Sequence, residues 1–149
     1  MLPPTRHYFA NAVGVVDYLP AHYIYLHWSG APMSSLELRA LYIHARNLLQ
    51  RENLCCILAD HRAMPAALTP ADQQWLLHTW LPQALAETGY SHCAVLPTLN
   101  PTCRLHTPPV VAELQQQLQV NLFQDLDHAA TWLLEVQREQ PPKPKSIPS

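Results

Sequence analysis

A carboxylate, an imidazole and a guanidinium follow one another at Asp60, His61 and Arg62, directly after the uncharged run 54–59. Such a run is typical of a buried strand, and open α/β sheets place their ligand sites at the carboxyl ends of strands. The three side chains have the chemistry to bind an anion or to transfer a proton. The sequence therefore predicts a candidate site at these residues.

Three interpretations of this triplet remain open. In the first, Asp60 caps or pairs locally with Arg62 and the His61 imidazole faces solvent. In the second, Arg62 recognises an anionic group on a ligand or partner, a role that suits its planar guanidinium. In the third, Asp60 orients His61 as a general base, although neighbouring residues of a strand normally point to opposite faces.

A second cluster of candidate residues begins at Thr69-Pro70-Ala71-Asp72. A capping threonine, a proline at the first helical position and an acid in the first turn are typical of a helix start. Tryptophan is more often a core residue, but Trp75 and Trp80 on this helix could line a pocket or a partner surface. The predicted ligand- or partner-binding surface comprises Asp60, His61, Arg62, Thr69, Asp72, Trp75 and Trp80.

Alternating and helical patterns along the chain predict the elements that position these residues. Strands are expected at residues 13–18, 23–28, 54–59, 92–96 and 120–123, with a short lead-in strand at residues 8–10. Helices are expected to begin at Ser34 or Ser35, at Thr69, after Pro109 and after Asp125. Pro82 removes a backbone donor, so a kink or break is expected near Trp80.

This order of elements predicts an α/β fold with one mixed sheet of four to five strands and about four helices, covered mainly on one face. Residues 13–18 and 120–123 are the expected edge strands, and self-association into a homodimer would protect them. The domain is expected over residues 1–139. The proline- and lysine-rich residues 140–149 are expected to be a disordered tail.

Composition and spacing exclude several classes of function. The 149 residues carry a formal charge of -2, without the basic stripe that nucleic acid requires. Neither a signal peptide nor an apolar run of about 20 residues is visible, so we expect a cytoplasmic protein that is not an integral membrane protein. Three glycines cannot form a phosphate-binding loop, and no serine nucleophile elbow appears.

The cysteines and histidines do not form a metal-binding motif. Cys55 and Cys56 are expected on opposite faces of one strand, as thiols that cannot bond to each other. Cys103 and His106 form a single CxxH pair without a second pair, and the nine histidines are scattered. We therefore predict no metal, no cofactor and no catalytic residue.

The order of elements over about residues 13–134 resembles the STAS fold, and the small bacterial SpoIIAA-like or STAS/SEC14-like proteins in particular. The segments that carry the resemblance are Tyr25-Leu26-His27-Trp28-Ser29-Gly30, Leu58-Ala59-Asp60-His61-Arg62, Leu68-Thr69-Pro70-Ala71-Asp72-Gln73-Gln74-Trp75-Leu76 and Asp125-Leu126-Asp127-His128-Ala129-Ala130-Thr131-Trp132-Leu133.

The resemblance implies a non-enzymatic module that binds a protein partner or regulates one. In the antagonist family, a strand that ends in Asp leads to a phosphorylatable Ser or Thr at the next helix start, which corresponds here to Asp60 and Thr69. The plain alternative for Thr69 is helix capping. The SEC14-like resemblance implies a second function, a carrier of a small molecule or lipid in an apolar pocket between sheet and helices.

Overall fold

The computed structural model describes residues 4–101 and 107–139, which form one mixed six-stranded sheet in the order β1-β2-β3-β4-β5-β6. The strands β1, β2 and β3 pair antiparallel, and β3 to β6 pair parallel. The expected tail at residues 140–149 and the CxxH pair of Cys103 and His106 lie outside the described residues. The strands are β1 (Arg6–Ala10), β2 (Gly14–Leu19), β3 (Tyr23–Trp28), β4 (Cys56–Asp60), β5 (His92–Leu96) and β6 (Gln119–Leu122).

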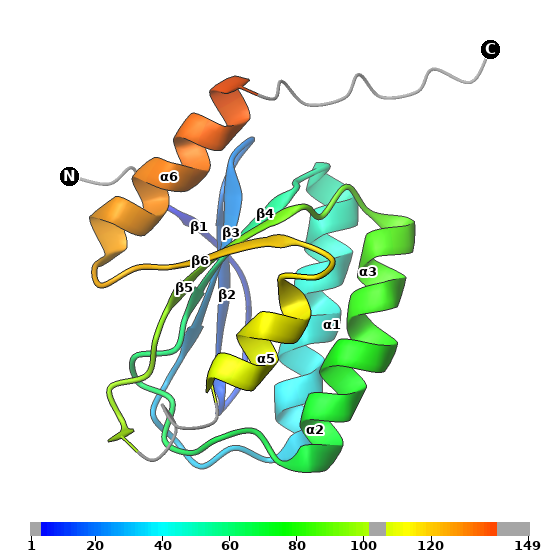
Figure 1. Ribbon diagram of the computed structural model, residues 1–149, viewed down its shortest axis with the longest axis vertical. Coiled ribbons are helices and arrows are strands. Elements are labelled where there is room, and N and C mark those ends of the chain that lie inside the picture. Colours follow the sequence, from blue (N-terminus) through cyan, green and yellow to red (C-terminus); the bar gives the residue numbers. More distant parts are fainter. Residues whose placement is uncertain (1–3, 102–106, 140–149) are drawn as a thin grey trace.

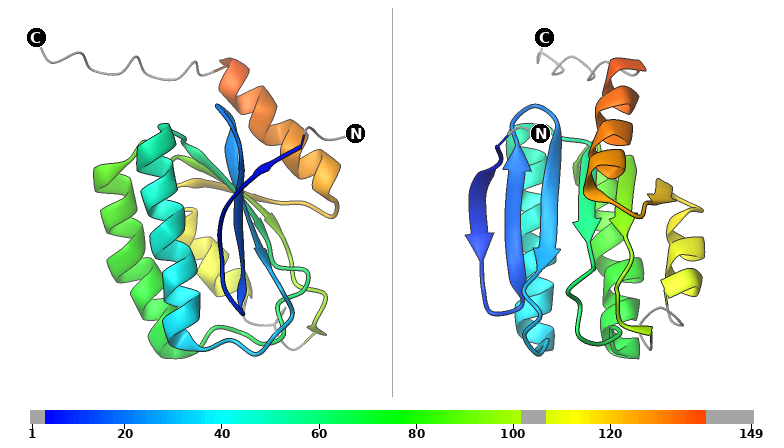
Figure 2. Two further views of the ribbon diagram at one scale, coloured as in Figure 1. Left: turned by 180° about the vertical axis from the view of Figure 1, so that it is seen from behind. Right: turned by 90° about the vertical axis from the view of Figure 1, so that its left-hand side faces the viewer.

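Helices cover both faces of the sheet unequally. Figure 1 shows α1, α2, α3 and α5 on one side, which we call the helical face, and α6 alone on the other side, which we call the α6 face. Figure 2 shows that the second face is covered over part of the sheet only, and α6 packs mainly on β5 and β4. The helices are α1 (Ser35–Glu52), α2 (Pro70–Trp75), the π-helical turn η1 (Leu76–Trp80), α3 (Leu81–Glu87), α5 (Thr107–Leu114) and α6 (Leu126–Glu139).

The α/β class and the mixed sheet agree with the sequence prediction, but the number of strands does not. Residues Arg6–Ala10 form a full strand that pairs with β2, so the sheet has six strands rather than four or five. The addition of β1 also moves residues 13–18 inside the sheet, and the prediction that they form an edge was wrong. The edges are β1 and β6.

The ends of the first two helices follow the predicted capping signals. The Ser34 side chain accepts a hydrogen bond from the backbone N–H of Glu37, and α1 ends at Asn53 in the left-handed conformation with φ 53°. The Thr69 side chain accepts from the backbone N–H of Asp72, with Pro70 in the first turn.

Near Trp80, where a kink or break was expected, the helix is not broken but widens into a π turn. Here the backbone N–H of Leu81 donates to the carbonyl of Leu76, five residues earlier. Pro82 has no N–H to give to His78, and the wider turn lets α2, η1 and α3 follow one another without interruption. The π turn directs Leu76 and Trp80 inward, where both are buried.

Each face of the sheet has its own core. On the helical face, alternate residues of β3 and β4, such as Leu26 and Ile57, pack against α1 and η1. On the α6 face, Leu58 and Ala94 pack against Leu133. Cys55 and Cys56 both belong to the α6 side, because β4 begins only at Cys56, so the expectation of opposite faces was wrong. Their sulfur atoms are 3.5 Å apart, a contact between thiols rather than a disulfide.

Within residues 4–101 and 107–139, no helix combines the length and the apolar composition needed to cross a bilayer.

Candidate functional site

The end of β4 sends its polar side chains to opposite faces of the sheet. Asp60 follows Leu58 on the α6 face, whereas His61 continues the line of Ala59 on the helical face and lines a cavity there. This divergence follows from the two-residue period of a strand. Asp60 therefore does not orient His61, and the two do not form an acid–base pair.

On the α6 face, Asp60 is the centre of a hydrogen-bonded network. Its carboxylate accepts from Arg62 Nε at 2.9 Å and Arg62 Nη2 at 2.8 Å, and the Tyr25 hydroxyl donates to it at 2.7 Å. The backbone N–H of Arg62 adds a further bond at 3.1 Å. Asp60 is only 6% exposed, yet all of its strong acceptor sites face donors. The local pairing in the first interpretation is therefore present.

These bonds fix the charge states of the network. Burial acts to raise the pKa of Asp60, but the hydrogen bonds from Arg62 and Tyr25 outweigh it and hold the pKa below its ordinary value of 3.8. The bond to Asp60 raises the pKa of Arg62, and burial together with Asp60 raises the pKa of Tyr25. At neutral pH the network thus holds one carboxylate, one guanidinium and one neutral phenol.

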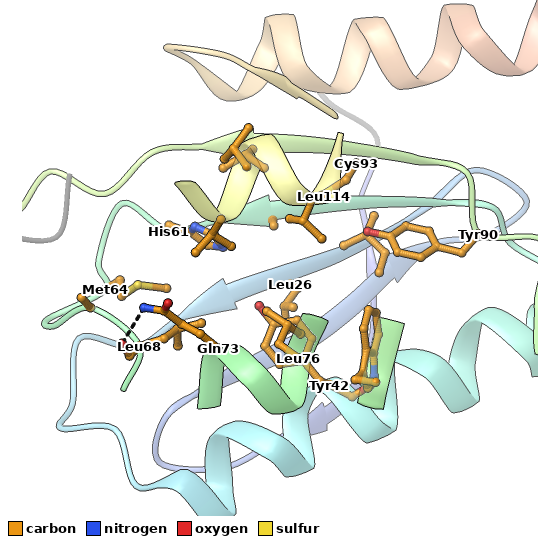
Figure 3. Close-up of a pocket in the computed structure, with 17 residues that line it drawn as sticks. Leu26, Tyr42, His61, Met64, Leu68, Gln73, Leu76, Tyr90, Cys93 and Leu114 are labelled. Carbon is orange, nitrogen blue, oxygen red and sulfur yellow. Dashed lines mark hydrogen bonds between the residues drawn. The ribbon is translucent and has the colours of Figure 1, made fainter. Parts of the chain in front are cut away.

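On the helical face, the sheet and the helices enclose an apolar cavity of about 90 Å³. Figure 3 shows His61, Met64, Leu68 and Gln73 at one end of it and Tyr90 and Cys93 at the other. Among the described residues, the lining includes no Asp, Glu, Lys or Arg. Its apolar walls come from β3, β4, β5, α1, η1 and α5 and include Leu26, Ile57, Val95, Tyr42, Leu76, Trp80, Val111 and Leu114.

His61 is the polar group of the cavity whose bonding is incomplete. Its Nε2 atom is buried and has no hydrogen-bond partner among the residues that the structure describes. The imidazole meets the indole of Trp28 edge to face, with ring centroids 4.6 Å apart at an angle of 83°. Burial lowers the pKa of His61 from 6.5 to about 4, against a smaller opposing effect of the Asp60 charge. The ring is therefore neutral at physiological pH. His61 is half-buried, and its Nε2 is turned inward, whereas the first interpretation expected the imidazole to face solvent.

The loop after His61 is fastened to the segment that follows β5. The backbone N–H of His61 donates to the carbonyl of Leu96 at 2.9 Å, and the Thr98 hydroxyl donates to the carbonyl of Met64 at 3.2 Å. The Asn100 side chain donates to the carbonyl of Pro65 at 3.0 Å. Thr98 is 1% exposed, so this fastening belongs to the interior and holds Met64 against the cavity.

The predicted residues at the start of α2 connect two helices. Asp72 accepts from the Ser35 hydroxyl at 2.8 Å and from Arg39 Nε at 3.0 Å, and the Arg39 guanidinium lies 5.3 Å from the ring centre of Trp75. Burial acts to raise the pKa of Asp72, but the bonds from Ser35 and Arg39 keep it below 3.8. Asp72 and Trp75 thus join α2 to α1, next to the capping residue Thr69.

The seven predicted site residues consequently lie in three places. Asp60 and Arg62 lie on the α6 face, His61 and Trp80 line the cavity, and Thr69, Asp72 and Trp75 lie at the junction of α2 with α1.

Sequence reasoning missed Tyr25, Trp28, Gln73 and Thr98, which contact these groups. The alternation of β3 placed Tyr25 and Trp28 on opposite faces. Only the parallel register, in which His27 lies beside Asp60, shows that they reach the end of β4.

In comparisons with protein-family models, with curated proteins and with solved structures, nothing matched this chain. Over residues 4–101 and 107–139, no group of three or more His, Cys, Asp or Glu side chains is placed to hold a metal ion.

Proposed function

We propose that this protein binds a small, largely apolar molecule in the cavity between its sheet and its helices, and that it acts by binding rather than by catalysis. The observation that carries the proposal is the cavity itself, lined by apolar side chains of three strands and three helical segments. Concave apolar sites with few polar groups are the usual form of small-molecule sites.

The size of the cavity limits the ligand. A volume of about 90 Å³ is well below the roughly 300–1,000 Å³ of sites for drug-sized molecules. It is also smaller than the roughly 150 Å³ of an engineered apolar cavity that takes up benzene, so the ligand is limited to about one ring or a short chain. This favours a small molecule over a two-chain lipid.

The geometry supports binding without chemistry. Asp60 and His61 diverge, and Asp60 is fully engaged by Arg62 and Tyr25. A catalytic acid–base pair needs both groups within reach of one substrate. The cavity brings together His61 and side chains such as Gln73 and Cys93, and burial raises the pKa of the Cys93 thiol to about 11. A thiol in that state is a poor nucleophile.

A protein-binding module, the function implied by the STAS-like resemblance, is the second candidate. The observation that favours it is Arg62, whose side chain is 40% exposed although Asp60 holds its Nε and Nη2 atoms. A guanidinium fixed in this way is preorganised for an anionic group of a partner. Loss of partner capture in Arg62→Ala, with the fold intact, would support this function.

The cavity proposal is tested by filling the cavity. Val95→Phe places a ring in it from β5, and Val15→Phe makes the same exchange on the opposite face of the sheet, at a half-buried position of β2. We expect toluene to raise the melting temperature of the wild type and of Val15→Phe, and to leave Val95→Phe unchanged. Equal responses of the two variants, or no response of the wild type, would contradict the proposal.

A further inference from the structure

Two buried nitrogen atoms without a protein partner lie on touching rings at the edge of the cavity. They are Trp28 Nε1 and His61 Nε2, and among the described residues they are the only buried side-chain nitrogen or oxygen atoms in this condition. Their rings meet at a centroid distance of 4.6 Å. Two unsatisfied polar atoms at one place are unusual, because buried polar groups in folded proteins are nearly always hydrogen-bonded.

The neighbouring polar groups show that the condition is local. Trp80 Nε1 donates to the carbonyl of Tyr42 at 2.5 Å, and Gln73 Nε2 donates to the carbonyl of Leu68 at 3.0 Å, a bond visible in Figure 3. The cavity wall thus satisfies one indole and one amide but leaves the imidazole of His61 unbonded, and the indole of Trp28 beside it is unbonded as well. The side chain nearest in sequence, Asp60, is on the other face of the sheet and cannot serve them.

The chemistry of the two atoms defines the group that would satisfy them. An indole N–H only donates, whereas the second nitrogen of a neutral imidazole accepts or donates according to the tautomer. A hydroxyl oxygen can accept from one atom and donate to the other, and a carbonyl oxygen can accept from a donor. A carboxylate or an ammonium group would enter a lining that offers no opposite charge among the described residues.

We propose that the cavity selects small apolar molecules that carry one uncharged oxygen, an alcohol, phenol or carbonyl, and that this oxygen hydrogen-bonds to His61 Nε2. This inference rests on the proposed function. His61 is the recognition group, the apolar lining excludes charged analogues, and Trp28 holds the imidazole edge to face from behind the lining.

Phenol and toluene form a matched pair of probes for this inference, because a hydroxyl replaces a methyl on the same ring. We expect the wild type to bind phenol at least as tightly as toluene, measured by titration calorimetry at pH 7.5. In His61→Phe, phenol binding should weaken about tenfold while toluene binding changes little, since one hydrogen bond in a buried site is lost. In the control Gln73→Met, the other uncharged hydrogen-bonding side chain at that end of the cavity is removed, and the preference should remain.

A second measurement uses the unmodified protein. In ¹⁵N-histidine-labelled wild type, the Nε2 resonance of His61 should shift on addition of phenol and stay in place with toluene. One outcome refutes the selectivity and leaves the binding function standing. In that outcome toluene binds, phenol binds more weakly than toluene, and the His61 resonance does not move. A preference that disappears in Gln73→Met instead would assign recognition to the wrong residue. If neither probe binds, the proposed function itself fails.

Discussion

The two faces of the sheet treat neighbouring polar residues in opposite ways. On the α6 face, Asp60 is buried and ionised, with donors from Arg62 and Tyr25 on both oxygens. One residue later, on the helical face, His61 is half-buried and neutral, and its buried Nε2 has no hydrogen-bond partner among the described residues. A carboxylate could not be buried without partners, whereas an imidazole can lose its proton and remain.

This difference suggests different roles for the neighbouring residues Asp60 and His61. A fully bonded network stabilises the end of β4 and has little capacity left for a ligand. An incompletely bonded atom at an apolar cavity costs stability and offers a ligand a bond that the protein does not make itself. Under the proposed function, Asp60 belongs to the scaffold and His61 to the ligand site.

The largest effect is expected from Asp60→Ala. The exchange leaves the Arg62 guanidinium and the Tyr25 hydroxyl without their acceptor, so the free energy of unfolding should fall by about 3 kcal/mol. Urea denaturation followed by tryptophan fluorescence measures this change. The matched exchange Asp17→Ala, at a less buried carboxylate of β2, should cost less. A loss no greater than that of Asp17→Ala would break the comparison.

The pH dependence of stability should show the two faces in separate windows. The pKa of His61 is lowered to about 4 in the folded state, whereas in the unfolded chain it is about 6.5. The contribution of the neutral imidazole to the free energy of unfolding is therefore complete above pH 6.5. It is lost as the pH falls toward 4, because the unfolded chain binds the proton first. We expect a loss on the order of 2 kcal/mol from this residue. The pKa of Asp60 is also lowered, from 3.8, so its contribution is lost only as the pH falls below that value.

The pH window of His61 is isolated by measuring the free energy of unfolding of the wild type and of His61→Phe at pH 7.5, 5.5 and 4.5. The variant should lose less stability than the wild type between these values. His78→Phe removes an exposed imidazole outside the cavity and serves as the control. Parallel curves for the wild type and His61→Phe would show that the imidazole is not buried in neutral form.

The smallest effects sharpen the contrast at constant pH. Tyr25→Phe removes one donor from Asp60 and should cost about 1 kcal/mol in the free energy of unfolding at pH 7.5. His61→Phe removes a nitrogen that has no protein partner and should cost nothing or stabilise the fold. Thermal denaturation of both variants provides the comparison, and a larger loss for His61→Phe than for Tyr25→Phe would reverse the assignment of the two faces.

Much of the frame around the site could be predicted from the sequence. The two-residue period of β4 predicts that Asp60 and His61 point to opposite faces, as the alternation in β3 does for its own residues. The Thr69-Pro70 pattern predicts the start of α2 at the correct residue. These are local patterns, which depend on a few residues of the chain. The first strand was predicted only in part, because its partners and not its own composition make Arg6–Ala10 an edge strand.

The content of the site could not be predicted, because it depends on contacts between distant segments. Tyr25 reaches Asp60 only through the parallel register of β3 and β4, and Trp28 reaches His61 in the same way. The loop that carries Met64 is held by Thr98, 34 residues later. No local pattern around Asp60, His61 and Arg62 indicates that one imidazole turns toward a cavity.

Native mass spectrometry of the freshly purified protein, repeated under denaturing conditions, tests the central claim most directly. The account predicts a noncovalent adduct of a small, uncharged organic molecule that is released on denaturation and is absent from Val95→Phe. Where expression supplies no ligand, phenol added before the measurement should give the same adduct. A bare mass with and without phenol, or an adduct that persists in Val95→Phe, would contradict the account.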